Sequence, residues 1–163
     1  MAQTFSQLPP FFRHRYAYTS HMCTVLTVEQ MYDADRWAIT RGTSGVTLME
    51  AAGKACADAI RERFDKCQVA VLWGPGNYGG AGFVIARLLR QEGWGVSTFL
   101  MGERESLQGD AGHMAHRWNG PVYSLAPDAI DNAELVVDAL FGAGLSKDLD
   151  GTPRALAEVA AAR

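Results

Sequence analysis

The sequence contains no apolar run that approaches the roughly 20 residues of a transmembrane helix. It has only three cysteines among 163 residues, Cys23, Cys56 and Cys67, and their spacing is not that of a metal site. Unpatterned cysteines in odd number predict reduced thiols, as in a cytoplasmic protein. Positive charge is not in excess either, since the formal net charge is −3. These absences argue against a membrane protein, a disulfide scaffold and a general binder of nucleic acid or membrane surfaces.

Acidic residues are missing from the beginning of the chain, where the first one is Glu29. The same stretch carries Arg13 and Arg15, and an acid-free, arginine-bearing start is typical of organelle transit peptides. A disordered extension, or a start codon placed upstream of Met22, explains the composition equally simply, and we favour this interpretation. We therefore expect residues 1–22 to be disordered and the folded domain to occupy residues 23–163.

A glycine-rich stretch stands between a predicted strand and a predicted helix. The run Val69–Trp73 is short and apolar, as in a buried strand, and Gly74–Gly82 then contains five glycines in nine residues. Phe83–Arg90 has apolar residues at helical spacing, so we expect a helix to begin after the glycines. A helix N-terminus behind a glycine loop favours binding of phosphate or another anion. A turn that only packs strand against helix is the alternative.

The remaining pattern alternates strands with helices. Two helices are predicted before the first strand, because Thr27 with Gln30 and Thr47 with Glu50 have the spacing of capping boxes. Further strands are expected at Val96–Leu100, Pro121–Leu125 and Glu134–Leu140, and further helices at Ser106–Trp118 and Pro153–Ala162. Such alternation predicts right-handed crossovers and a parallel sheet covered on both faces.

Asp138 is a candidate functional residue because it ends the fourth predicted strand. Gly142 and Gly144 follow it, and ligands of parallel sheets lie beyond the carboxyl ends of the strands. A carboxylate there can hold a cation, bind a hydroxyl or act as a general base. It can also simply accept hydrogen bonds from the backbone of the following loop. We favour the functional interpretation because of its place on the sheet.

The first glycine loop also fits the spacing of a dinucleotide-binding fingerprint, with Glu103 as a candidate partner for a ribose hydroxyl. Two helices precede it, however, and Pro75 removes one loop N–H, so the context is only partial. No Lys-Ser or Lys-Thr pair follows the loop, which excludes a Walker-type phosphate loop.

Four segments in order resemble the NAD(P)HX epimerase family, also called YjeF N-terminal domains: Leu26–Met31, Leu48–Gly53, Gly74–Gly82 and Val136–Leu145. The resemblance runs from about Leu26 to the end of the chain. It implies a three-layer αβα Rossmann-like sandwich with a mostly parallel sheet, preceded by two helices and usually dimeric. Members interconvert the S and R forms of hydrated NADH and NADPH, a damage product. In many bacteria the domain is fused to an ADP- or ATP-dependent dehydratase that restores the dinucleotide.

The resemblance also implies a site. The family binds a potassium ion near the substrate, and by position its ligands here are Asp138 and Tyr78. Asp138 is also the residue expected to shuttle the proton during epimerisation. The substrate-binding positions that carry over are Asn77, Tyr78, Gly79, Gly80, Ala81, Gly142, Ala143, Gly144, Leu145, Ser146, Lys147 and Asp148.

The sequence departs from the family pattern in three places. Where the family's glycine loop has its second Asn and its Asp, this chain has Tyr78 and Ala81. The third departure is at the C-terminus. The family continues into a further strand ending in Asp-Ile/Val-Pro-Ser-Gly, and this segment is absent from this sequence, so we expect an incomplete domain. The alternative function is a non-catalytic nucleotide-binding or dimerisation module of the same fold. A NAD-dependent oxidoreductase is disfavoured by the two leading helices and the lack of a Tyr-Lys or His-Asp arrangement.

Overall fold

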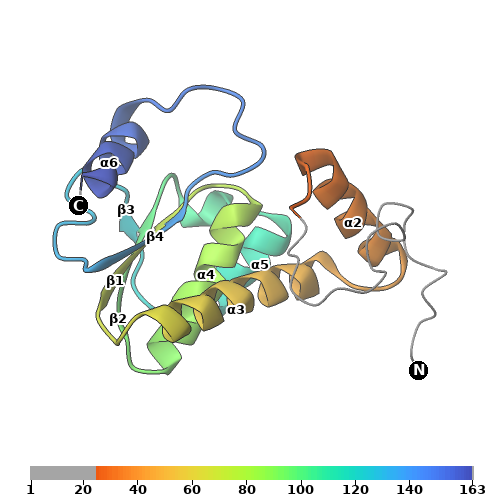
Figure 1. Ribbon diagram of the computed structural model, residues 1–163, viewed down its shortest axis with the longest axis horizontal. Helices are drawn as coiled ribbons and strands as arrows, with labels where there is room; N and C mark the ends of the chain where they lie inside the picture. Colours follow the sequence, from red (N-terminus) through yellow and green to blue (C-terminus); the bar gives the residue numbers. More distant parts are fainter. Residues whose placement is uncertain (1–24, 163) are drawn as a thin grey trace. The chain divides into compact units, whose positions relative to one another are not determined.

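The computed structural model describes residues 25–162 (Figure 1). The predicted disorder of residues 1–22 lies outside this range. The chain divides into two compact units, Met1–Ser44 and Gly45–Arg163, and the second contains the whole sheet. Within residues 25–162, no helix combines the length and the apolar character needed to cross a membrane.

The first unit contains helix α2 (Val28–Thr40). Its N-cap is Thr27, whose hydroxyl accepts a hydrogen bond from the Gln30 N–H at 3.2 Å. The Gln30 side chain in return accepts from the Thr27 N–H at 2.9 Å. This confirms the predicted capping box. The helix ends before Gly42, which has a φ of 93° and so uses a conformation that glycine adopts without strain.

The sheet has four parallel strands in the order β3-β2-β1-β4. They are β1 (Gln68–Trp73), β2 (Gly95–Leu100), β3 (Tyr123–Ser124) and β4 (Leu135–Ala139). The chain moves outward from β1 to β3 and then crosses back to place β4 on the other side of β1. In doubly wound sheets, ligands bind where the order reverses in this way, which here is between β1 and β4.

Helices cover both faces of the sheet. On one face lie α3 (Gly45–Arg63), α4 (Asn77–Gln91) and α5 (Gly109–Arg117), and on the other lies α6 (Gly151–Ala161) (Figure 1). Alternate residues of β1 point to the two faces, so Val69 and Val71 pack with the three helices. Leu72 packs with Leu156 of α6 on the other face. The predicted αβα sandwich is confirmed.

Trp73 is the last residue of β1 and packs in the core at that end of the strand. Its ring centroid lies 3.6 Å from that of Phe83 in α4 and 5.9 Å from that of Trp118. The side chain is fully buried, and its indole N–H has no hydrogen-bond partner among residues 25–162. Gly82 of α4 lies against it, because a β-carbon there would come within 2.5 Å of Trp73 Cδ1.

Helix α4 begins earlier than the apolar spacing indicated, at Asn77 instead of Phe83. Gly79, Gly80 and Gly82 are therefore helical and buried, and they bring the helix close to its neighbours. A β-carbon at Gly80, for example, would overlap the Met49 sulfur of α3. Close packing therefore requires glycine at these three positions.

Two other boundaries also differ from the predicted ones. Helix α3 begins at Gly45, so Thr47 lies inside the helix and is not its N-cap. The helix expected over Ser106–Trp118 is divided into a 3₁₀ turn, η2 (Arg104–Ser106), and α5. Gly109, with a φ of 58°, begins α5 in a conformation that separates the two pieces.

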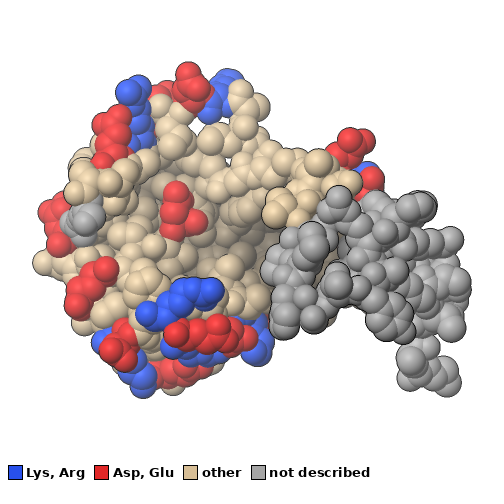
Figure 2. All heavy atoms as spheres, viewed as in Figure 1, with Lys and Arg blue, Asp and Glu red and all other residues tan. Residues whose placement is uncertain are grey.

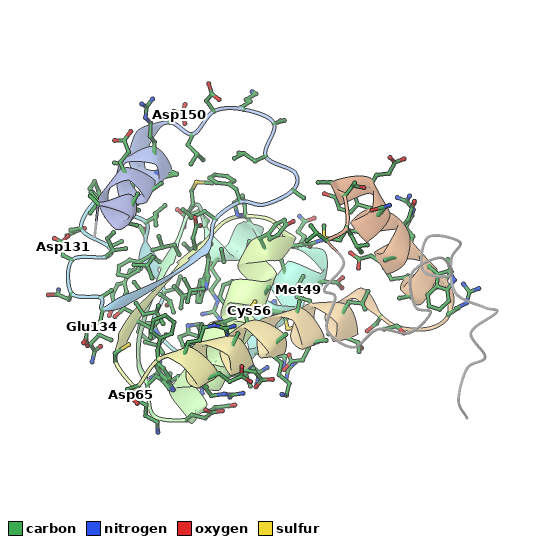
Figure 3. All side chains as sticks on the ribbon, viewed as in Figure 1. Met49, Cys56, Asp65, Asp131, Glu134 and Asp150 are labelled. Atoms are coloured by element: carbon green, nitrogen blue, oxygen red, sulfur yellow. The ribbon has the colours of Figure 1, made fainter. Side chains whose placement is uncertain are left out.

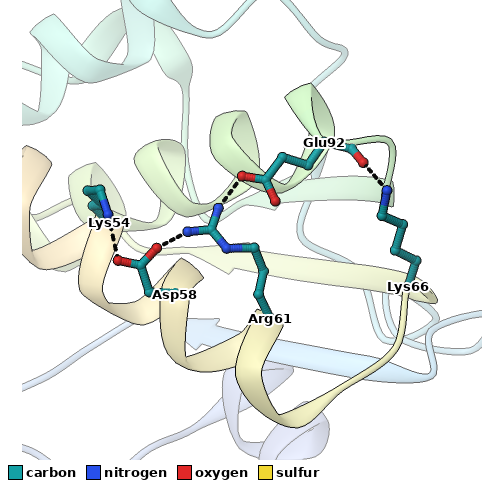
Figure 4. Close-up of polar contacts among 5 residues, drawn as sticks. All are labelled: Lys54, Asp58, Arg61, Lys66 and Glu92. Atoms are coloured by element: carbon teal, nitrogen blue, oxygen red, sulfur yellow. Dashed lines mark hydrogen bonds and ion pairs between the residues drawn. The ribbon is translucent and has the colours of Figure 1, made fainter.

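Ion pairs link helices on the face of the sheet that α3, α4 and α5 cover. In Figure 2, basic and acidic atoms gather along the lower edge of the molecule. Figure 4 shows a chain of contacts from Lys54 through Asp58 and Arg61 to Glu92, whose carbonyl oxygen also accepts a hydrogen bond from Lys66 at 2.5 Å. Exposed pairs of this kind contribute little individually.

The two cysteines in the described range, Cys56 and Cys67, are both free. Burial raises the pKa of the Cys67 thiol, and the nearby Glu134 carboxylate raises it further. A raised thiol pKa lowers the fraction of Cys67 that is present as thiolate, the reactive form.

Candidate functional site

The carboxyl ends of β1 and β4 bring the two glycine-containing segments into contact. The Gly74 N–H donates a hydrogen bond to the Ala139 carbonyl oxygen at 3.0 Å. A β-carbon at Gly74 would overlap the Leu140 carbonyl oxygen, so only glycine permits this approach of the two backbones. The segments predicted to share a site therefore do begin side by side.

The N-terminus of α4 lies at this edge without a side-chain cap. Its N-cap is Gly76, which has no side chain to accept a hydrogen bond from the first turn. The N–H groups of Asn77, Tyr78 and Gly79 occupy that turn, where no intrahelical acceptor exists. Asn77 and Gly76 are exposed. These donors, together with the positive end of the helix dipole, favour an anion such as phosphate.

Asp138 is exposed near the end of β4, opposite Leu72 of β1. Its Oδ1 accepts a hydrogen bond from the Leu140 N–H at 3.0 Å, which is the structural role that the sequence left open. Within residues 25–162, Oδ2 makes no hydrogen bond or ion pair. One oxygen of this carboxylate therefore orders the loop while the other is available to a ligand.

Tyr78 connects the two segments directly. Its hydroxyl oxygen accepts a hydrogen bond from the Ala143 N–H at 2.9 Å, although the two residues are 65 positions apart. Its ring lies over Gly142, where any β-carbon would overlap ring atoms. The sequence placed all three residues in the site but contained no signal for this contact, which depends on the tertiary fold.

The other predicted substrate-binding residues fall into two groups. Gly80 is buried against α3, and Ala81 is half-buried with its carbonyl oxygen toward Gly53 of that helix. After Ala143 the segment is exposed and arches away from the sheet toward α6 (Figure 1); it carries Gly144, Leu145, Ser146, Lys147 and Asp148. The structure therefore brings Tyr78, Gly142 and Ala143 into contact, while Asp138 lies in the strand that leads into this segment and Asn77 precedes Tyr78 in the first turn of α4.

Carboxylates at the other end of β4 are separate from this arrangement. Asp131 and Glu134 precede the strand, and Figure 3 shows them away from the α4 N-terminus. Glu134 accepts a hydrogen bond from the Gln68 N–H at 3.2 Å, where β1 begins. In the range 25–162, no three or more His, Cys, Asp or Glu side chains gather in a way that could hold a metal ion.

Curated proteins of similar sequence are named for one activity. An NAD(P)H-hydrate epimerase of Rhodobacter capsulatus is 43% identical over 154 residues, which covers 86% of this chain and 72% of that protein. An NAD(P)H-hydrate epimerase of Roseobacter litoralis is 36% identical, and 68% of it is covered. A bifunctional NAD(P)H-hydrate repair enzyme Nnr of Coxiella burnetii is 36% identical over 124 residues, and this chain spans only 25% of its length.

A solved structure shares the fold. The crystal structure of yeast ynu0 has a TM-score of 0.66 and 26% sequence identity, covering 83% of this chain and 64% of the yeast chain. Residues 45–163 match the family described as YjeF-related protein N-terminus, and this match includes the sheet, all of its helices and both glycine-containing segments. The chain therefore belongs to the family of YjeF-related protein N-terminal domains.

Proposed function

We propose that this chain epimerises the S and R forms of hydrated NADH and NADPH in nicotinamide nucleotide repair. The observation that carries the proposal is that an uncapped helix N-terminus follows β1 and a partly free carboxylate, Asp138, lies near the end of β4, at the carboxyl ends of the two strands that flank the switch point. The names of the bacterial relatives support an enzyme over the non-catalytic module.

Binding of the dinucleotide would begin with its pyrophosphate. The first-turn N–H groups of α4, from Asn77 to Gly79, provide donors for an anion at the end of β1. The segment after β4 contacts this turn at Gly142 and Ala143 and continues to Lys147, whose positive charge favours the same ligand. Residues Asn77–Ala81 and Gly142–Asp148 are therefore proposed to hold the substrate.

The chemical step would use Asp138. The hydrated nicotinamide carries its hydroxyl on a carbon next to the ring nitrogen, so inversion requires reversible cleavage of a bond at that carbon with proton transfer. A carboxylate can give a proton to the departing group and take it back after the opposite face has been exposed. The hydrogen bond from the Leu140 N–H fixes Oδ1, which leaves Oδ2 to exchange the proton.

A potassium ion is proposed as the cofactor, held by Asp138 and Tyr78. The donor chemistry fits, because hard cations prefer oxygen ligands and both side chains present oxygen. The Tyr78 hydroxyl oxygen has two lone pairs, of which the Ala143 N–H uses one. When bound, the ion would supply positive charge beside the substrate.

Three further expectations also remain proposals. Two relatives carry the name of a bifunctional repair enzyme, which supports coupling of this domain to an ADP- or ATP-dependent dehydratase. A homodimer is proposed from the family resemblance, and sedimentation of the purified chain tests it. A cytoplasmic location is proposed from the cysteine usage.

The test is to measure how fast the purified 163-residue chain equilibrates S- and R-NADHX in potassium buffer, with the epimers separated by chromatography. We expect clear acceleration over the uncatalysed rate. Asp138→Asn should lower kcat about 100-fold or more, because it removes general acid–base transfer. Potassium should raise the Tm of the original chain and not that of Asp138→Asn.

The matched control is Asp131→Asn, which makes the same chemical change at an exposed position before β4. It should retain the original rate. No acceleration by the original chain would refute the epimerase proposal. An unchanged rate in Asp138→Asn would refute only the role given to that carboxylate.

A further inference from the structure

The contact between Tyr78 and the segment after β4 is more specific than general packing. Tyr78 is the second residue of α4, and its side chain reaches a loop that follows a different strand. The phenol oxygen takes the Ala143 N–H at 2.9 Å, while the ring covers Gly142. One side chain thus provides both a polar and a steric contact.

The contact requires glycine at position 142 but not at the nearby position 144. A β-carbon at position 142 would overlap three ring atoms of Tyr78. At Gly144 a β-carbon would meet no atom within 4 Å, and the residue is exposed. The missing side chain at 142 is therefore the space that the Tyr78 ring occupies.

The Tyr78 hydroxyl still has a donor to offer. A phenol oxygen that accepts one hydrogen bond keeps its own O–H hydrogen. Within residues 25–162, no acceptor receives that hydrogen. The same residue belongs to the first turn of α4, where backbone donors and the helix dipole favour an anion. An anionic oxygen bound at that turn would be a suitable acceptor for the phenol.

We propose that Tyr78 is a positioning residue that ties the start of α4 to residues 142–148 and orients that segment for the dinucleotide's phosphate groups. That the ligand is a dinucleotide rests on the proposed function. The contact of Tyr78 with Gly142 and Ala143, called the tie below, does not. By holding the segment before the ligand arrives, the contact lowers the ordering cost of binding. Its loss should therefore weaken substrate binding and leave the proton transfer at Asp138 in place.

The first test measures hydrogen exchange of the Ala143 amide by NMR in the ligand-free chain. Tyr78→Phe keeps the ring and removes the acceptor, so protection of this amide should fall about two- to tenfold, the range that one hydrogen bond contributes. Gly142→Ala should cause a similar fall, because its methyl group displaces the ring. Gly144→Ala should leave the protection unchanged.

A second measurement separates the tie from a general effect of each substitution. In a Tyr78→Ala background, where the ring is already gone, adding Gly142→Ala should cause no further loss of Ala143 protection. Full additivity of the two changes would overturn the proposal. Unchanged Ala143 protection in Tyr78→Phe would overturn it as well.

In kinetics, the proposal predicts that loss of the Tyr78 contact affects KM more than kcat. At saturating potassium, Tyr78→Phe should raise KM for NADHX several-fold and lower kcat far less than Asp138→Asn does, since Tyr78 orients the substrate segment and Asp138 does the chemistry. A fall in kcat at constant KM would contradict the positioning role. If the original chain shows no epimerase activity while the amide results hold, the tie stands and the proposed function fails.

Discussion

At the scale of single residues, the carboxyl end of β1 shows how closely this core is packed. Gly82 lies in the interior of α4, where alanine would normally favour the helix by about 1 kcal/mol. Its position against Trp73 reverses this preference, because a β-carbon would come within 2.5 Å of Cδ1 of Trp73 and 2.9 Å of the Ala139 β-carbon. Trp73 in turn is held by Phe83, so it has little freedom to move.

We therefore expect Gly82→Ala to lower the free energy of unfolding by about 1–3 kcal/mol, as overpacking of a dense core does. Urea denaturation followed by tryptophan fluorescence measures the change. Gly144→Ala is the matched control, because a methyl group there meets no atom within 4 Å, and it should leave the free energy of unfolding nearly unchanged. Equal stability of the two variants would show that α4 can shift away from Trp73.

At the scale of elements, the end of α5 is fixed by a side chain from the preceding turn. Arg104 of η2 directs one guanidinium nitrogen to the carbonyl oxygens of Ala115 and Trp118, the latter at 2.8 Å. These carbonyl groups lie at the C-terminus of the helix, where intrahelical donors have run out. Trp118 itself packs edge-on against Trp73. The arginine thus connects a helix end to the core.

Replacing this arginine should loosen α5. We expect Arg104→Ala to lower the free energy of unfolding by about 1.5–3 kcal/mol, the range for hydrogen bonds to a charged group. Arg154 provides the comparison, since within residues 25–162 its side chain pairs only with the exposed Glu158 of α6. Arg154→Ala should leave the denaturation midpoint unchanged. Equal midpoints for both variants would mean that Arg104 contributes no more than a surface charge.

The same scale shows which elements could be predicted from the sequence. All four strands and the capping box at Thr27 were visible, because apolar runs and cap spacing are local signals. The start of α4 was not, since its first turns consist largely of glycines that add nothing to an apolar period. The start of α3 was misplaced because Thr47 imitates a cap that the helix, beginning at Gly45, does not use.

At the scale of the second unit, Gly45–Arg163, the two faces of the sheet are covered unequally. Three helices lie on one face, whereas α6 covers the other and buries only Leu156. Leu156 is 1% exposed and packs with Leu72 of β1. A helix attached through one buried side chain is expected to open more readily than the rest of the unit.

Leu156→Ala should therefore lower the free energy of unfolding by about 2–5 kcal/mol. It should also make the backbone amides of α6 exchange their hydrogens faster. The amides of α4 should still exchange only through global unfolding of the domain. Val159→Ala is the control on the same helix, because Val159 is largely exposed, and it should change stability by less than about 0.5 kcal/mol. Protection of α6 in Leu156→Ala equal to that in the original chain would refute this view of the smaller face.

The placement of the candidate site's residues on the sheet could be predicted at this scale, but the contact between Tyr78 and Ala143 could not. Alternating strands and helices place Asp138 and both glycine segments at the carboxyl edge of the sheet, and the structure has them there. The hydrogen bond between Tyr78 and Ala143 joins parts of the chain 65 residues apart, and only the packed fold brings them together.

The fit of Tyr78 over Gly142 also constrains the order in which these positions can change. A larger residue at position 142 meets the ring of Tyr78, so it displaces that ring unless residue 78 is already small. Shortening the side chain at 78 first, for example to asparagine, leaves position 142 open to alanine. The opposite order passes through a chain in which the ring has been forced out of its place. Mutational histories of this loop pair therefore run more easily in one direction than in the other.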